Sequence, residues 1–140
     1  MDYIKEDAYE TAKKIRRLLQ DEIIDHTIYV RVERRVKNPA VIISWTDGPM
    51  EDVIESILDT FINAKPYYEF KGQMYKGADY VRCRRMLSKQ RKELIQRRIL
   101  ETSVSVDKQS IKVYQMLAAE AEMIEAGIFK SFSLRKQRKP

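Results

Sequence analysis

The sequence has very little of the chemistry on which most enzymes and metal sites depend. Its 140 residues include one cysteine, one histidine and one tryptophan, with only four glycines and four prolines. A lone cysteine excludes a disulfide within the chain, and one cysteine with one histidine cannot supply a zinc cluster. None of the four glycines stands in a GxxxxGK[ST] phosphate-binding loop. We therefore expect no catalytic residue, no metal and no cofactor, and we predict that the protein is not an enzyme.

The sequence also lacks long apolar runs. No stretch approaches the ~20 apolar residues of a membrane-spanning helix. The first residues, MDYIKEDAYE, are acidic and do not have the basic-then-apolar order of a signal peptide. We expect a soluble, cytoplasmic protein without a membrane partner.

What the sequence does have is enough length for one core and an uneven distribution of charge. A chain of this size buries about two thirds of its unfolded surface without needing disulfides or metals. We predict a single domain over residues 1–130 and a flexible basic tail over 131–140. The net charge is +6, and residues 71–98 hold 10 of the 27 basic residues but only 2 of the 21 acidic ones. This imbalance favours an anionic partner.

The first part of the chain changes its periodicity once. Residues 2–25 repeat apolar side chains at steps of three and four, which predicts a helix. Residues 26–36 switch to a period of two, which predicts a half-buried strand. The two faces of this strand carry Ile28, Val30 and Val32 on one side and Tyr29, Arg31 and Glu33 on the other. The turn signal KNPA and a second strand over 40–45 then predict an antiparallel hairpin.

The motif corner Trp45, Thr46, Asp47, Gly48 and Pro49 follows that hairpin. Pro49 suits the first turn of a helix, and the side chain of Thr46 or Asp47 can accept a hydrogen bond from a free N–H there. We predict that a helix begins within about two residues of Pro49 and that Trp45 is buried beneath it. A recognition role for Trp45 and Asp47 is the alternative interpretation.

The second half of the chain allows two interpretations. Segment 79–87, DYVRCRRML, alternates like a strand, although a continuous helix over 79–100 competes with it. Ser88 suits the N-cap of a helix over 89–100, and Asp107 suits the cap of a last helix that ends near residue 127. One side of that last helix carries Ile111, Tyr114, Leu117, Ala121 and Ile124. The connection over 63–78 shows no single pattern.

Together these patterns predict an α+β fold in the order αββαβαα. Its sheet is small and mainly antiparallel, with three or more strands, and the helices cover one face. His26 lies between a helix and a strand, which predicts a loop residue. Cys83 alternates with Val81 on the inward face of its segment, which predicts a core residue despite the basic surroundings that could lower the pKa of its thiol.

A basic segment is the strongest candidate for a binding site. It comprises Arg82, Arg84, Arg85, Lys89, Arg91, Lys92, Arg97 and Arg98. Guanidinium groups near aromatic side chains suit phosphate contacts and base stacking, and Tyr75 and Tyr80 lie close in the sequence. A solvated helix face is the alternative, because Lys89, Glu93 and Arg97 are spaced for pairing along a helix.

Two stretches resemble a known family. "IISWTDGP", followed by an amphipathic helix, and "GADYVRCRRMLS" resemble the large polyvalent protein associated domains, in particular the twenty-ninth type of that series. Cys83, Arg85 and Ser88 match the Cys-x-Arg-x-x-Ser element of the second stretch. The resemblance covers about residues 8–100 and leaves 101–130 as a helical extension. The resemblance implies a small α+β module from phage or conjugative elements, and it identifies no catalytic residue.

Two functions fit these observations. The first is a non-enzymatic accessory protein of a phage or mobile element that binds nucleic acid through the basic segment, with the tail residues Arg135, Lys136, Arg138 and Lys139 adding affinity. The second is an anti-defence inhibitor or adaptor whose basic face meets an acidic protein surface. The sequence leaves the choice between DNA, RNA and protein open, and also the oligomeric state.

Overall fold

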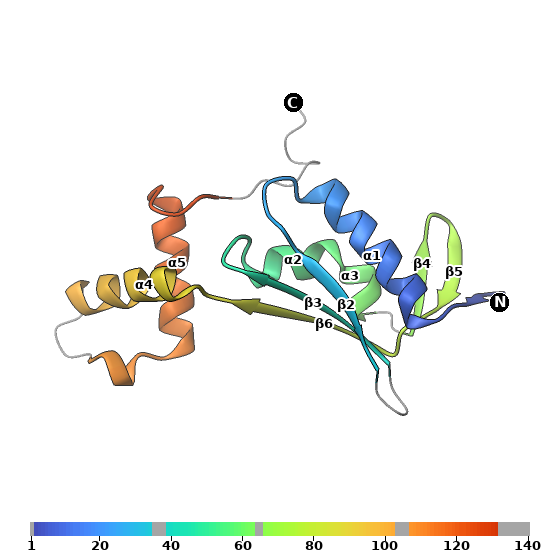
Figure 1. The fold of residues 1–140 in the computed structure, drawn as a ribbon. Coiled ribbons are helices and arrows are strands. Elements are labelled where there is room, and N and C mark those ends of the chain that lie inside the picture. Colours follow the sequence, from blue (N-terminus) through green and yellow to red (C-terminus); the bar gives the residue numbers. More distant parts are fainter. Residues whose placement is uncertain (1, 35–38, 64–65, 103–106, 132–140) are drawn as a thin grey trace. The chain divides into compact units, whose positions relative to one another are not determined.

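The structure is a computed structural model that describes residues 2–34, 39–63, 66–102 and 107–131 (Figure 1). These residues form two compact units. Unit 1 comprises residues 2–45 and 49–85, and unit 2 comprises residues 46–48 and 86–131, each within the described ranges. The single domain over 1–130 stays a prediction. Apart from residue 131, the predicted basic tail lies outside the described residues.

Unit 1 contains most of the strands and the first helices of the chain. In chain order its elements are β1 (Ile4–Lys5), α1 (Ala8–Glu22), β2 (Tyr29–Glu33), β3 (Ala40–Thr46), α2 (Glu51–Ile57), α3 (Asp59–Asn63), β4 (Tyr67–Phe70), β5 (Gln73–Lys76) and β6 (Tyr80–Met86). Unit 2 follows with α4 (Lys89–Thr102), the short 3-10 helix η1 (Lys108–Ser110) and α5 (Val113–Glu125).

The predicted α+β class is confirmed. The order αββαβαα is recovered by α1, β2, β3, α2, β6, α4 and α5, and segment 79–87 contains a strand rather than the start of a long helix. The additional elements are short. Strand β1 occupies the beginning of the segment predicted as a helix over 2–25, because α1 starts only after Asp7, whose side chain accepts a hydrogen bond from the N–H of Glu10 at 2.9 Å.

The described strands form two three-stranded sheets instead of the one sheet that we predicted. One has the order β1-β5-β4, and the other has the order β2-β3-β6. In the first sheet, β1 and β5 are parallel and β4 and β5 are antiparallel. In the second, β2 and β3 form the predicted antiparallel hairpin. The N–H of Asp47, directly after β3, donates to the carbonyl of Met86 at the end of β6, so these two strands end together and run parallel.

The unassigned connection over 63–78 contains the β4–β5 hairpin. Phe70 pairs with Gln73, and the two residues between them have positive φ angles, 51° for Lys71 and 80° for Gly72. Two left-handed residues in a two-residue loop match the twist of antiparallel strands. The sequence did not predict this turn, because its first position holds Lys71 where asparagine or aspartate is the usual signal.

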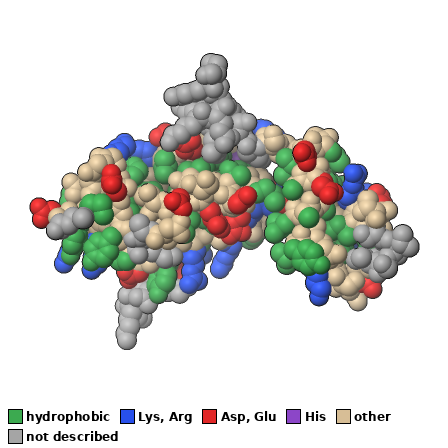
Figure 2. Space-filling view, turned by 180° about the vertical axis from the view of Figure 1, so that it is seen from behind, with side chains coloured by type: hydrophobic (Ala, Val, Ile, Leu, Met, Phe, Trp, Pro, Cys, Tyr) green, Lys and Arg blue, Asp and Glu red, His purple; other side chains and the backbone are tan. Residues whose placement is uncertain are grey.

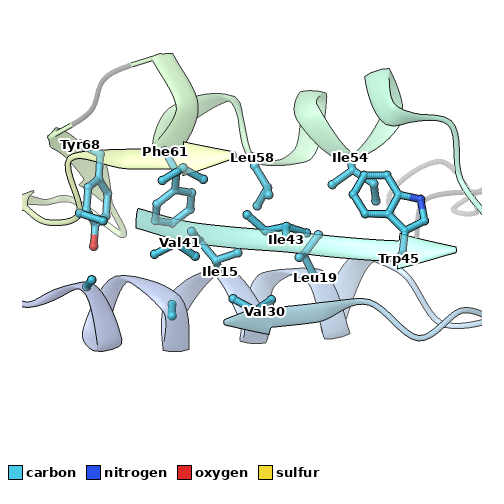
Figure 3. Packing of buried hydrophobic residues seen from close by; sticks show 14 of the residues in the cluster. Ile15, Leu19, Val30, Val41, Ile43, Trp45, Ile54, Leu58, Phe61 and Tyr68 are labelled. Atoms are coloured by element: carbon cyan, nitrogen blue, oxygen red, sulfur yellow. The ribbon is translucent and has the colours of Figure 1, made fainter. Parts of the chain in front are cut away.

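Three helices cover one face of the β2-β3-β6 sheet, as the sequence predicted (Figure 1). Figure 3 shows β3 with Val41, Ile43 and Trp45 lying between side chains of α1 and of the α2–α3 segment. Ile15 and Leu19 of α1 and Ile54, Leu58 and Phe61 of the α2–α3 segment complete this side of the core. Each of these residues is at most 3% exposed, so the centre of this face is desolvated, while Val32 and Cys83 on the outer strands are partly buried.

Unit 2 has its own small core. Ile95 and Ile99 of α4 pack with Ala119 and Met123 of α5. Within this core the Nε–H of Arg91 donates to a carboxylate oxygen of Glu120 at 2.7 Å, and the Arg91 guanidinium lies 4.0 Å from the ring centre of Phe129. Removing one partner of such a buried pair leaves an uncompensated charge, which typically costs about 3–5 kcal/mol.

One expectation for the last helix is wrong. Asp107 caps η1 rather than α5, since its carboxylate accepts from the N–H groups of Gln109 and Ser110 at 3.0 Å. The side of α5 that carries Tyr114 and Leu117 is exposed, because α4 packs on a different side, through Ala119 and Met123.

The buried position of Trp45 predicts a large loss of stability on truncation. Its side chain is 1% exposed, and its Nε1–H donates to the carbonyl of Pro49 at 2.8 Å. Trp45→Ala should lower the free energy of unfolding by about 3–5 kcal/mol, measured by chemical denaturation. Tyr29→Ala is the matched control, because Tyr29 is 65% exposed on the partner strand, and it should change stability by less than about 0.5 kcal/mol. Equal stability of the two variants would contradict this account of the core.

Candidate functional site

The motif corner after β3 is a structural element. Helix α2 begins at Glu51, within two residues of Pro49 as predicted, and Trp45 is buried. The predicted cap is wrong, however. The N-cap residue is Met50, which makes no side-chain capping bond, and the carboxylate of Asp47 is used elsewhere.

Asp47 instead holds the start of α4. Its Oδ1 accepts from the N–H of Ser88 at 2.8 Å, and its own N–H donates to the carbonyl of Met86 at 2.7 Å. The Ser88 hydroxyl in turn accepts from the N–H of Arg91 at 3.2 Å, as an N-cap does. The corner residue Asp47 and the Ser88 of the later stretch are thus directly bonded. The contact accounts for the carboxylate of Asp47, and the capping bond to Arg91 accounts for the hydroxyl of Ser88.

Asp47 also has a left-handed backbone, with φ of 57°. Aspartate and asparagine tolerate this conformation better than residues without a short polar side chain. Asp47→Asn keeps both the tolerance and an acceptor for Ser88 N–H, so it should leave stability nearly unchanged. Asp47→Ala loses both and should lower the free energy of unfolding by about 1–3 kcal/mol. Asp47→Gly, which loses only the acceptor, should fall between them. An alanine variant as stable as the asparagine variant in chemical denaturation would contradict this role.

Two members of the predicted basic segment are not fully exposed: Arg91 is buried and Arg85 is half-buried. Arg91 is buried against Glu120, so its charge is paired within unit 2. Arg85 alternates with Val81 and Cys83 toward the helix-covered side of β6, where its charge acts on Glu51 of α2. Burial and the neighbouring Glu55 raise the pKa of Glu51, and Arg85 opposes that shift. The sequence could not reveal the Arg91 pair, because its acidic partner lies 29 residues away.

The other six members are exposed, and they are divided between the two units. Arg82 and Arg84 project from the face of β6 that the helices do not cover. The exposed members on α4 are Lys89, Lys92, Arg97 and Arg98. The α4 residues share their helix with Glu93 and Glu101, which fits the solvated-face interpretation for unit 2.

The uncovered face of the β2-β3-β6 sheet gathers further residues of the same chemistry. Tyr29 and Arg31 of β2 point to this face, opposite Ser44 and Ile42 of β3 in the antiparallel register. Tyr29 is 65% exposed, which leaves its ring available for stacking. Figure 2 shows Lys and Arg side chains projecting on the lower side of unit 1, the side on which Figure 1 draws the strands of this sheet.

We call these residues the open sheet face: Tyr29, Arg31, Tyr80, Arg82 and Arg84. Strands lie about 4.8 Å apart, so the β2 and β6 side chains flank the central strand at a separation of about 10 Å. The guanidinium of Arg82 lies 5.5 Å from the ring centre of Tyr80. One acid is close, since Glu33 lies 3.5 Å from Arg31 in a partly exposed ion pair. Sequence reasoning placed Tyr29 and Arg31 on one strand face but did not join them to Arg82 and Arg84, because strand order was unknown.

Cys83 and His26 lie where the sequence predicted. Cys83 is half-buried against the core of unit 1, as predicted, and burial, together with the charges of Glu55 and Glu51, raises the pKa of its thiol to about 12. The basic neighbours therefore do not activate it. His26 lies in the predicted connection between α1 and β2.

The raised pKa of Cys83 predicts slow alkylation of the native protein. At pH 8 a thiol of this kind is almost wholly protonated, whereas in the denatured chain its pKa is near 8.5. Reaction with iodoacetamide should be at least about a hundredfold slower in the native protein. The native rate should rise about tenfold per pH unit between pH 8 and 10, while the denatured rate levels off. A native rate that levels off near pH 9 would show an accessible, unperturbed thiol.

A polar cluster at the start of α1 was not predicted from the sequence. The carboxylate of Glu6 accepts from the Thr11 hydroxyl at 3.0 Å, from Lys14 Nζ at 2.5 Å and from the Tyr68 hydroxyl. Burial, followed by the bond to Glu6, raises the pKa of Tyr68. These groups satisfy one another and join β1, α1 and β4. The cluster therefore serves the fold of unit 1.

A cleft of about 480 Å³ lies beside that cluster, between α1 and the β4–β5 hairpin. Its basic lining comprises Lys13, Lys14, Arg16, Arg17 and Lys71, of which the first three bind groups of the protein. Lys13 pairs with Glu10 at 3.6 Å, and Arg16 donates to the carbonyl of Val30 at 2.8 Å. The cleft is therefore a second basic surface of unit 1, but its rings, Phe70 and Tyr75, are only partly exposed, whereas Tyr29 on the open sheet face is 65% exposed.

Comparison with protein-family models, with curated proteins and with solved structures gives no match. The resemblance to the large polyvalent protein associated domains stays a prediction. Within the described ranges, no three or more His, Cys, Asp or Glu residues gather in a way that could hold a metal ion. No helix in this part of the chain is both long and apolar enough to cross a membrane.

Proposed function

We propose that this protein binds single-stranded nucleic acid through the open sheet face. The observation that carries the proposal is the combination of Arg31, Arg82 and Arg84 with the exposed ring of Tyr29 on a sheet face that the helices of unit 1 leave uncovered. Open sheet faces with aromatic and basic side chains are a common platform for single-stranded RNA.

The chemistry of the face divides into two roles. The ring of Tyr29 offers a stacking surface for a base, which is worth about 1–3 kcal/mol per base and tolerates any sequence. The guanidinium groups of Arg82 and Arg84 suit phosphate oxygens, because their planar fork of donors fits two oxygens at once. Arg31 lies beside Tyr29 on the same face and extends the positive charge to the β2 side.

A single strand fits better than a duplex for a geometric reason. Direct reading of duplex DNA uses a helix or a two-stranded ribbon that enters the major groove. A flat sheet face instead accepts unstacked bases, which only a single strand offers without a cost in base pairing. The open sheet face therefore revises the binding set predicted from sequence. It keeps Arg82 and Arg84 and gains Tyr29, Arg31 and Tyr80. Arg85, Arg91 and the four exposed basic residues of α4 lie outside it.

The setting of this activity is also part of the proposal. The resemblance of the Trp45–Pro49 and Cys83–Ser88 stretches supports a phage or conjugative element as the source. In such a setting the protein would act inside the host cell as an accessory factor on the nucleic acid of the element. The exposed charges of α4 would add affinity without sequence preference.

Fluorescence anisotropy with a short labelled single strand tests the proposal. Binding should weaken with salt, with a log-log slope of roughly −0.7 per phosphate contacted. Arg82→Glu/Arg84→Glu should lower affinity at least about tenfold at 50–100 mM salt and reduce the slope by about 1.4. Tyr29→Ala should lower affinity about 5- to 150-fold while leaving the slope unchanged, because stacking releases no counterions.

Lys13→Glu/Arg17→Glu is the matched control, since it makes the same change in net charge on the exposed side of α1. This variant should keep most of the affinity. Equal losses in both double variants would show that net charge alone drives binding. Absence of binding to single strands and duplexes of DNA and RNA would overturn the proposal and favour an acidic protein surface as the partner of these arginines.

A further inference from the structure

The exposed side of α5 carries a contiguous apolar stripe. Val113, Tyr114 and Leu117 are 76%, 71% and 47% exposed, and the exposed Ala118 and Ala121 continue the stripe along the helix. Their spacing of three and four residues puts Tyr114, Leu117, Ala118 and Ala121 on one side, away from the Ala119 and Met123 side that packs on α4. Figure 2 shows hydrophobic side chains exposed on unit 2. A contiguous exposed patch of this kind marks an interaction surface.

The charges along α5 identify the kind of partner. Lys112 precedes the helix, whereas Glu122 and Glu125 lie near its end, and its last turn has no basic residue. Negative charge at a helix C-terminus opposes the helix dipole, so this arrangement is unfavourable for α5 alone. It becomes complementary when a second α5 runs in the opposite direction, because each basic N-terminal end then meets an acidic C-terminal end.

We propose that two copies of this chain associate through antiparallel α5 helices. The two-fold axis passes between Ala118 and Ala121, so that Ala118 of one copy faces Ala121 of the other. The same symmetry places Tyr114 opposite Glu125 and brings Lys112 within a turn of Glu125. Small side chains at the centre let the helices approach closely, while Tyr114 and Leu117 pack on both sides of the axis. The interface is isologous, as in most homodimers.

The size of this contact sets its strength. Thirteen residues of helix extend for about 20 Å. One helix of that length buries less than the roughly 800 Å² per partner of a standard interface. The dimer is therefore a concentration-dependent equilibrium, independent of the proposed nucleic-acid binding.

Sedimentation velocity over a range of concentrations tests the association, with reducing agent present because Cys83 is a free thiol. The mass should rise with concentration from 16.6 kDa toward twice that value. Leu117→Glu should keep the protein monomeric, with unchanged helix content by circular dichroism. Leu94→Glu is the matched control, since Leu94 is a similarly exposed leucine on α4, and it should leave the equilibrium unchanged.

A charge exchange tests the antiparallel direction. Lys112→Glu and Glu125→Lys each put like charges across the interface and should weaken association, although each improves the match of α5 to its own dipole. A loss of association therefore cannot be assigned to a weakened helix. The double variant Lys112→Glu/Glu125→Lys should restore the dimer, because both pairs are then opposite again. A monomer at all concentrations, a dimer that survives Leu117→Glu, or a double variant weaker than both single variants would overturn the proposal.

Discussion

One-sided packing of the β2-β3-β6 sheet is the constraint on which the rest of unit 1 depends. Helices α1, α2 and α3 bury one face, so alternate residues of the outer strands β2 and β6 face the core and their neighbours are directed to the other face. The central strand β3 is buried on both faces, since Ala40 and Ile42 are at most 3% exposed. Val30 in the core directs Tyr29 and Arg31 outward, and Val81 does the same for Arg82. A shift of one residue in register would exchange the two faces, which would bury arginines under the helices. The core packing behind the sheet therefore decides which residues form the open sheet face.

The corner after β3 fixes where this arrangement ends. Trp45 fills the end of the core, and Asp47 then bonds to Met86 and Ser88, where β6 ends and α4 is about to begin. Trp45 and Asp47 suggested a recognition site. The burial of Trp45, the left-handed backbone of Asp47 and its hydrogen bond to Ser88 N–H explain both residues by structure. The sheet, and not the corner, carries the proposed function, because it presents the exposed side chains of Tyr29, Arg31, Arg82 and Arg84.

Local patterns predicted much of this structure, and contacts between distant residues account for what they missed. The period of two in segments 26–36 and 79–87 predicted both strand faces, including those of Tyr29 and Arg82. It could not show that β2 and β6 flank the same central strand, because strand order depends on long-range pairing. The basic run likewise included Arg91, whose burial depends on Glu120 in a later helix. The stripe through Tyr114 was visible in the sequence, but its exposure follows from which side of α5 meets α4.

The central claim is that the open sheet face is the binding surface, and mapping backbone amide shifts by nuclear magnetic resonance tests it most directly. Isotope-labelled protein would be titrated with a short unlabelled single-stranded oligonucleotide under reducing conditions. The account predicts that the largest shifts fall on Tyr29–Glu33 and Tyr80–Arg85, with smaller shifts on α1, α2 and α3 behind the sheet. Shifts concentrated on the α1 side of unit 1, or no shifts at saturating oligonucleotide, would contradict it.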